Sequence, residues 1–272
     1  MRYYDDHVFV ICAYKESPYL EACIRSLLAQ TVKSRIIVAT STSVASVRDL
    51  AERYELPLYV NEKKCGIASD WEYAYEKARE TAGYVTIAHQ DDIYLPHYTE
   101  KVISRLEEER EALLCFTDYA ELRNGRKLDI SPYTAVKRAM LFPLKCPILK
   151  DIKQAERWIL SFGNPIMCPT VTYNTAVLPE TLFLSEFKSN IDWDTWEKLS
   201  RRQGRFIYEP HALLLHRIHK NAATAQLIYR QERAKEDLAM FLKFWPEPLA
   251  KCIMKFYSLG EINYKNIGNE RY

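Results

Sequence analysis

The sequence predicts an α/β protein built on a doubly wound, mostly parallel sheet flanked by helices. Two observations carry this prediction. Short strands alternate with amphipathic helices through the first ninety residues, and the opening strand, Val8 to Ala13, is apolar at every position. A continuous apolar run is typical of a parallel strand covered on both faces. The alternation is typical of right-handed βαβ units, which build a parallel sheet.

The first half of the chain contains four predicted strands, at residues 8–13, 35–39, 58–60 and 84–88. The first helix is expected to begin at Pro18, after a Ser17 cap. The next two are expected at 43–54 and over the stripe from Ala68 to Ala78, which Gly83 can terminate. The second half is less regular, with strands at 113–117 and 213–218 and helices near 151–160 and 191–202.

A boundary is predicted near residue 220. Residues 1–220 are expected to form the main body, and residues 221–272 a C-terminal helical extension. A long helical stretch from Ala222 to Phe244, followed by Pro246 and Pro248, motivates this division.

Composition restricts the partners and the compartment. Lys and Arg number 38 against 36 Asp and Glu, so the overall charge predicts no nucleic-acid partner. The seven cysteines form no CxxC pair, the first six residues are polar, and no apolar run is long enough for a membrane helix. We therefore expect a cytoplasmic protein, with a location at the inner face of the membrane left open.

The segment from Arg123 to Lys153 is rich in basic residues. It has eight of them against two acidic residues, Asp129 and Asp151. A solvated loop and a surface facing a phosphate-rich or acceptor ligand both fit this pattern.

Ligands of doubly wound sheets bind beyond the carboxyl ends of the strands. Here those ends are Tyr14 to Glu16, Thr40 to Thr42, Asn61-Glu62 and His89 to Asp92. The Asp91-Asp92 pair is the strongest local feature, because adjacent carboxylates repel each other unless a cation neutralises them. Mg²⁺ or Mn²⁺ with oxygen ligands satisfies such a pair, whereas the alternative is that the two residues only cap the next helix.

An ordered series of segments resembles family 2 glycosyltransferases of the GT-A fold. The opening strand and helix of that family are similar to residues 10–16 and 26–31 here. Gly66 with its helix, and then His89 to Asp92, resemble the donor-binding and metal-binding segments. Asp192-Trp193-Asp194 and Arg217-Ile218-His219 resemble the catalytic-base helix and the segment that follows it.

This resemblance implies the site residues. The catalytic base would be Asp192, with Asp194 as its competitor, and Trp193 would contact the acceptor. The metal ligands would be Asp92 and His219. The donor would be bound by Ala13, Tyr14, Glu16, Thr40, Thr42, Gly66, Asp70, Gln90, Asp91 and Arg217. Two segments depart from the family pattern, because Thr40 to Thr42 stand where acidic residues are usual and His89 replaces an aspartate.

The implied activity is that of an inverting glycosyltransferase, dependent on Mn²⁺ or Mg²⁺, with residues 1–220 as its catalytic domain. It would move a sugar from a nucleotide diphosphate to an acceptor hydroxyl in polysaccharide or glycolipid synthesis. The alternatives are a nucleotide-sugar-binding or scaffold protein of the same fold and, less favoured, a nucleotidyltransferase.

The C-terminal segment from Leu238 to Tyr257 combines aromatic residues with lysines. Such a segment is compatible with contact to an anionic membrane that carries a lipid-linked acceptor. It is equally compatible with packing on the body or with oligomer formation.

Overall fold

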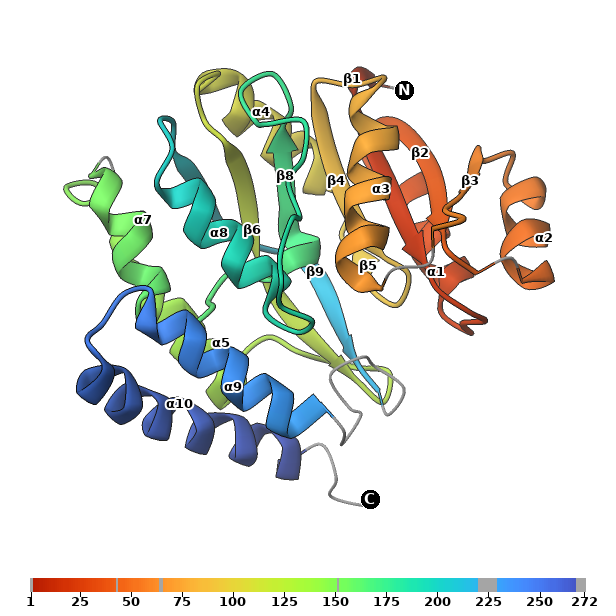
Figure 1. Cartoon of the computed structure of the whole chain (residues 1–272). Coiled ribbons are helices and arrows are strands. Elements are labelled where there is room, and N and C mark those ends of the chain that lie inside the picture. The colour runs from red at the N-terminus through yellow and green to blue at the C-terminus, as the bar shows by residue number, and fades with distance from the viewer. Residues whose placement is uncertain (1, 43, 64–65, 151, 220–228, 268–272) are drawn as a thin grey trace. The chain divides into compact units, whose positions relative to one another are not determined.

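A computed structural model describes residues 2–42, 44–63, 66–150, 152–219 and 229–267 (Figure 1). The chain divides into two compact units. The first comprises residues 1–120, 167–184 and 204–217, and the second comprises residues 121–166, 185–203 and 218–272. The C-terminal helices therefore share a unit with two earlier segments of the chain.

One sheet, most of which belongs to the first unit, has the strand order β3-β2-β1-β4-β8-β6-β9-β5. Strand β7 pairs with residues 121–123 at the end of β6, and both of these segments belong to the second unit. The strands are β1 Arg2–Ala13, β2 Val32–Thr40, β3 Leu58–Val60, β4 Tyr84–His89, β5 Ile93–Tyr94, β6 Leu114–Arg123, β7 Arg126–Leu128, β8 Val171–Asn174 and β9 Phe206–Ile218.

The α/β class is confirmed, and the sheet is mixed. Strand β1 runs parallel to β2 and β4, and β2 runs parallel to β3. The pairs β4–β8, β6–β8, β5–β9 and β6–β7 are antiparallel. Strands and helices alternate along the sequence in the parallel part of the sheet. Two neighbouring parallel strands must be joined by a crossover connection, which is usually a helix.

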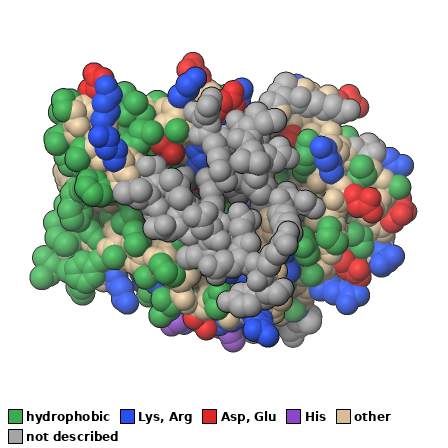
Figure 2. Space-filling model, turned by 90° about the horizontal axis from the view of Figure 1, so that it is seen from below, with side chains coloured by type: hydrophobic (Ala, Val, Ile, Leu, Met, Phe, Trp, Pro, Cys, Tyr) green, Lys and Arg blue, Asp and Glu red, His purple; other side chains and the backbone are tan. Residues whose placement is uncertain are grey.

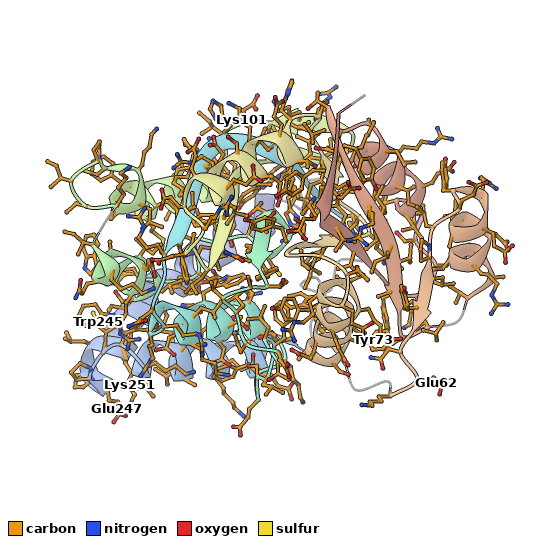
Figure 3. The ribbon with its side chains drawn as sticks, turned by 90° about the horizontal axis from the view of Figure 1, so that it is seen from above. Glu62, Tyr73, Lys101, Trp245, Glu247 and Lys251 are labelled. Carbon is orange, nitrogen blue, oxygen red and sulfur yellow. The ribbon has the colours of Figure 1, made fainter. Side chains whose placement is uncertain are left out.

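The helices of the first unit are α1 Leu20–Leu28, α2 Ala45–Arg53, α3 Ile67–Arg79 and α4 Tyr98–Glu108. Alternate residues of β1 face opposite sides of the sheet. Phe9, Ile11 and Ala13 join the core cluster that includes buried residues of α1 and α4. Helix α3 contacts β1, β2 and β4, and the hydroxyl of its Tyr73, labelled in Figure 3, donates to Val60 O (3.1 Å).

Two local predictions need correction. Helix α1 begins at Leu20 rather than at Pro18, and Ser17 Oγ accepts a hydrogen bond from Tyr19 N (3.3 Å) in the preceding turn. Gly83 does not cap α3, which ends at Arg79. A Cβ at position 83 would lie 2.4 Å from Asp6 Oδ2, so a larger residue there would displace this exposed side chain, which accepts a hydrogen bond from Gly83 N (2.6 Å).

The second unit contains α5 Pro132–Met140, α6 Phe142–Lys145, α7 Lys153–Leu160, α8 Ile191–Ser200, α9 Tyr229–Leu242 and α10 Glu247–Ile267. The start of the predicted helix at Ala222 lies outside the described residues. Trp193 of α8 packs edge-on against Phe241 of α9, with ring centroids 5.1 Å apart. On the surface of α10, Glu247 and Lys251 form an ion pair of 2.6 Å (Figure 3). None of the described helices is long and apolar enough to cross a membrane.

Candidate active site

The parallel strands of the first unit end together, as the sequence predicts. Ala13 pairs with Thr40, Thr40 pairs with Val60, and Cys12 pairs with His89. The residues that follow β1, β2, β3 and β4 therefore gather at one edge of the sheet.

Asp70 lies in the first turn of α3 and is held by two neighbours at this edge. Ser41 Oγ donates to one carboxylate oxygen (2.9 Å), and Asn61 Nδ2 donates to the other (3.3 Å). Burial raises the pKa of Asp70, although both hydrogen bonds act in the opposite direction. Ser41 and Asn61 are buried, so this is a fixed polar group at the place where β2 and β3 end.

Thr42 and Gln90 stabilise the loop that follows β1. Lys15 has a φ of 55°, in the left-handed region that a residue with a side chain rarely adopts. Its amide donates to Thr42 Oγ1 (2.6 Å). Gln90 accepts from Tyr14 N (3.1 Å) and donates to Tyr14 O (2.9 Å). Both predicted donor-binding side chains thus shape this loop, while the Tyr14 and Glu16 side chains are exposed.

Gly66 immediately precedes α3 with a φ of 96°. A Cβ there would meet nothing within 4 Å, so glycine is favoured by its backbone conformation and not by lack of space. No side chain among the described residues caps α3, and the N-terminus of a helix favours anionic groups.

The acidic pair forms the most polar part of this edge. Asp92 is fully buried, and its Oδ1 accepts hydrogen bonds from His216 Nδ1 (3.0 Å) and Arg217 N (2.9 Å). Its Oδ2 is buried and has no hydrogen-bond partner among the described residues. Ligand atoms of His89, Asp91 and Asp92 lie within 4.8 Å of one another.

These residues fit a divalent cation. A buried carboxylate oxygen without a partner costs free energy, and a metal ion would satisfy it. His89 belongs to this group, although the sequence pattern favoured Asp92 with His219. The structure assigns His219 to the second unit and does not include it in the group.

Arg217 is fixed by two contacts. Its Nε donates to Asp91 O (2.8 Å), and its guanidinium lies over the ring of Tyr19, 4.4 Å from the centroid. Stacking leaves the edge of a guanidinium available for hydrogen bonds, which suits a phosphate group.

In the second unit, Asp192 has the environment of a proton acceptor. It is half-buried, and its two oxygens accept from Trp193 N (2.8 Å) and Asn164 Nδ2 (2.8 Å). Burial raises the pKa of Asp192 above its ordinary value, and these hydrogen bonds and the charge of Lys137 only partly offset that effect. A raised carboxyl pKa is typical of general bases.

Asp194 has a different environment. It is buried, and its carboxylate accepts from Lys198 (2.7 Å) and from Lys243, which follows the end of α9. Burial alone would raise its pKa, but these lysines and Ser185 bring the pKa below its ordinary value. Asp194 therefore links α8 to the turn after α9 through ion pairs with two lysines.

The predicted acceptor contact of Trp193 needs correction. Its ring is fully buried between α7 and α9, and its Nε1 donates to Leu160 O (3.0 Å). It therefore has no exposed face on which a sugar could stack, and its role is in packing.

Sequence reasoning missed Tyr19, His216 and Asn164. Tyr19 contacts Arg217, and His216 contacts Asp92, although each pair is far apart in the sequence. Asn164 follows a glycine in a loop, with no motif around it. Only the tertiary structure brings these residues to Arg217, Asp92 and Asp192.

Comparison with known proteins identifies the family. The family model of glycosyl transferase family 2 matches residues 8–157, more than half of the chain. The chain therefore belongs to glycosyl transferase family 2. A search of curated protein sequences finds no significant match.

Solved structures show that the fold is GT-A. One is residues 1–349 of S. aureus TarS in complex with UDP-GlcNAc, at 15% identity and a TM-score of 0.64, covering 97% of this chain and 73% of that one. The chain spans 42% of a longer TarS structure. Another is the mannosyltransferase PcManGT from Pyrobaculum calidifontis in complex with GDP-Man and Mn²⁺, at 16% identity and a TM-score of 0.57, covering 91% and 68% of the two chains.

Proposed function

We propose that this glycosyltransferase transfers a sugar from a nucleoside diphosphate to an acceptor hydroxyl with inversion at the anomeric carbon. The observation that carries the proposal is the carboxylate of Asp92, which is buried at the carboxyl edge of the parallel strands. Only one of its two oxygens has a hydrogen-bond partner among the described residues. The solved structures with UDP-GlcNAc and with GDP-Man and Mn²⁺ support a nucleotide-sugar donor.

The proposed reaction is a single displacement. The acceptor oxygen forms a bond to the anomeric carbon, and the bond from that carbon to the diphosphate breaks, with the electron pair leaving on the diphosphate. The acceptor proton passes to Asp192, whose raised pKa suits a base and whose carboxylate Asn164 orients.

The donor is held, in this proposal, by residues at the edge of the sheet. Ser41, Asn61 and Asp70 offer polar atoms for the nucleoside, and Arg217 offers a guanidinium for the diphosphate. Asp92, with Asp91 and His89, would hold Mn²⁺ or Mg²⁺, which neutralises the charge that develops on the leaving diphosphate.

Thermal unfolding with a panel of nucleoside diphosphates tests the donor site. We expect one nucleotide to raise the midpoint in the presence of Mn²⁺ and to have little effect with a chelator. At a hundredfold excess over the dissociation constant, stabilisation should be about 2.7 kcal/mol. If no nucleotide raises the midpoint with any divalent metal, the donor proposal is wrong.

An apolar patch on the second unit supports an acceptor at a membrane, such as a lipid-linked precursor of a cell-surface glycan. The patch consists of Phe142, Ile148, Ile152, Trp158 and Phe162, whose exposed fractions range from 40% to 80%. Figure 2 shows hydrophobic side chains gathered on its left, on the side where Figure 1 places α7 and the start of α10. Large exposed apolar patches are typical of interaction sites.

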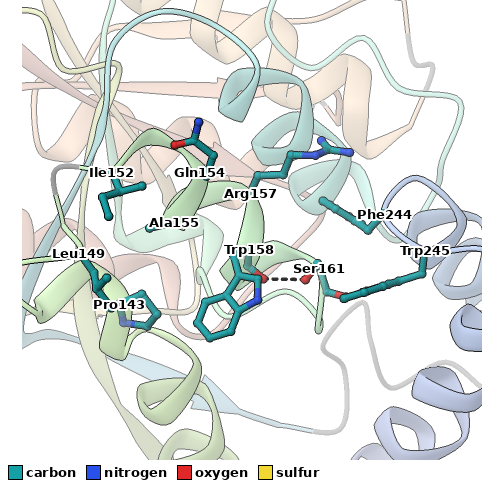
Figure 4. A pocket seen from close by; sticks show the side chains of 10 residues that line it. All are labelled: Pro143, Leu149, Ile152, Gln154, Ala155, Arg157, Trp158, Ser161, Phe244 and Trp245. Atoms are coloured by element: carbon teal, nitrogen blue, oxygen red, sulfur yellow. Dashed lines mark hydrogen bonds between the residues drawn. The ribbon is translucent and has the colours of Figure 1, made fainter.

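A cavity of about 520 Å³ opens within this patch (Figure 4). Ile152 and Trp158 line it together with Phe244 and Trp245. Ser161 Oγ donates a hydrogen bond to Trp158 O (2.7 Å), and this bond stabilises the end of α7 at the cavity. The walls are therefore aromatic and aliphatic, as an acyl or prenyl chain would require.

The charge around the patch favours an anionic bilayer. Among the described residues from 142 to 162, the charged side chains are Lys145, Lys150, Lys153, Glu156 and Arg157, and Lys153 is paired with Glu156. Lys145 and Lys150 are exposed. Exposed apolar side chains with lysines nearby suit the boundary between lipid tails and anionic headgroups, because the apolar side chains can enter the tails while the lysines contact the headgroups.

Vesicle sedimentation tests this membrane contact. We expect binding to vesicles with 20% phosphatidylserine, weaker binding to neutral vesicles, and a decrease with salt. Lys145→Ala with Lys150→Ala should weaken anionic binding about thirtyfold, since each basic residue near the surface contributes about 1 kcal/mol. Ile148→Ser with Trp158→Ser should remove most binding to both vesicle types.

Leu184→Ser is the matched control, because Leu184 is exposed but belongs to the first unit. It should bind vesicles as the wild type does. A wild-type protein that stays in the supernatant with anionic vesicles at low salt would contradict the membrane proposal and leave the donor site unaffected.

A further inference from the structure

His89 is the last residue of β4 and lies at the acidic pair. Its Nε2 is buried and has no hydrogen-bond partner among the described residues. One of its ring nitrogens lies with carboxylate oxygens of Asp91 and Asp92 in a group whose atoms are all within 4.8 Å of one another. An imidazole that has a buried nitrogen without a partner and lies in a group with two carboxylates is suited to bind a metal ion.

The imidazole ring is held in a fixed plane. It stacks on the indole of Trp71, with centroids 5.4 Å apart and an interplanar angle of 26°. Trp71 in turn packs edge-on against Phe183 at 5.6 Å. This support restricts rotation of the ring, so the direction of its nitrogens is set before any ligand arrives.

The carboxylate of Asp92 is oriented as well. His216 and the amide of Arg217 both donate to Oδ1, which leaves Oδ2 for another partner. Hydrogen bonds that fix the non-ligating oxygen are a common feature of metal sites. Both Asp92 and His89 therefore present one pre-set ligand atom.

We infer that His89 is a metal ligand and that its imidazole makes the site select a first-row transition metal, such as Mn²⁺ or Co²⁺, over Mg²⁺. Mg²⁺ prefers oxygen ligands and keeps most of its water, whereas imidazole nitrogen adds affinity along the series from Mn²⁺ to Co²⁺. The inference rests on the proposed function only in placing a metal at this edge of the sheet.

The direct test is electron spin echo spectroscopy of bound Mn²⁺, on protein without a histidine tag, with and without a nucleoside diphosphate. We expect coupling to an imidazole nitrogen in the wild type and its loss in His89→Gln. Competition by Mg²⁺ gives the second readout. The wild type should prefer Mn²⁺ over Mg²⁺ at least tenfold more strongly than His89→Asp, which supplies an oxygen at the same position.

His97→Gln is the control, because His97 is exposed and lies outside the metal group. It should keep both the nitrogen coupling and the metal preference. The midpoint of thermal unfolding shows whether each variant is folded, and His89→Asp keeps the test decisive if His89→Gln does not fold.

The outcomes separate this inference from the proposed function. Bound Mn²⁺ without nitrogen coupling, or an unchanged metal preference in His89→Asp, overturns the role of His89 while nucleotide binding can persist. Nitrogen coupling without any nucleotide-dependent stabilisation supports the role of His89 and contradicts the donor proposal. Failure to bind either metal, alone or with the nucleotide, overturns the inference.

Discussion

Asp192→Asn should lower kcat by about two to four orders of magnitude, which is the usual contribution of a general base. Donor binding should stay within about twofold of the wild type, because asparagine keeps the size of the side chain. The Trp193 amide and Asn164 donate to different oxygens of Asp192, so one of these two hydrogen bonds can persist on the remaining oxygen of the asparagine. The measurement is kcat together with nucleotide-dependent thermal stabilisation of the same preparation.

The pH profile of kcat provides a second measurement of the same role. A base must be deprotonated, so kcat should fall as the pH decreases through the pKa of Asp192. Burial raises that pKa, so this decrease should begin at a higher pH than for an ordinary aspartate. Asp192→Glu should keep an acidic limb, and Asp192→Asn should lose it.

Asp194→Asn is the matched comparison, two residues along the same helix. It leaves Lys198 and Lys243 without their shared anion, so we expect the free energy of unfolding to fall by about 1–3 kcal/mol. Its folded fraction should retain most of kcat. If Asp194→Asn abolishes turnover in folded protein while Asp192→Asn does not, the assignment of the base is reversed.

Asp92→Asn should abolish the metal-dependent part of nucleotide stabilisation and lower kcat at least a hundredfold. The amide removes the negative charge from the Asp92 side chain, whose Oδ2 is buried and has no hydrogen-bond partner among the described residues. Because two adjacent carboxylates repel each other and a buried anion is poorly solvated, the metal-free variant should be as stable as the wild type or more stable.

Calorimetry of the metal-free and Mn²⁺-loaded proteins separates the two effects. The expected pattern is an unchanged or higher midpoint without metal and no further increase with metal and nucleotide. A metal-dependent shift that persists in Asp92→Asn would contradict the role of Asp92. Asp49→Asn, at an exposed position of α2, should match the wild type in both states.

The sequence alone determines the α/β class and the edge of the sheet at which the site lies. Strands covered on both faces must be apolar throughout, and parallel neighbours need crossovers, so both features leave a local pattern in the chain. The same reasoning places Asp91, Asp92, Thr40 and Asn61 at one edge, because the carboxyl ends of parallel strands meet there. The ordered motifs that resemble glycosyltransferases are likewise local.

Only the tertiary structure decides what each polar side chain contacts. Asp192 and Asp194 are equivalent in the sequence pattern, but Lys243, 49 residues from Asp194, makes one of them a structural anion. The ring of Trp193 packs against Phe241 of α9 and is therefore not available to contact an acceptor. Asp92 is oriented by residues of β9 more than a hundred positions away, and His89 is fixed by Trp71. The burial and the hydrogen bonds of these side chains depend on residues that are distant in the chain. The local periodicity of the sequence therefore cannot predict them.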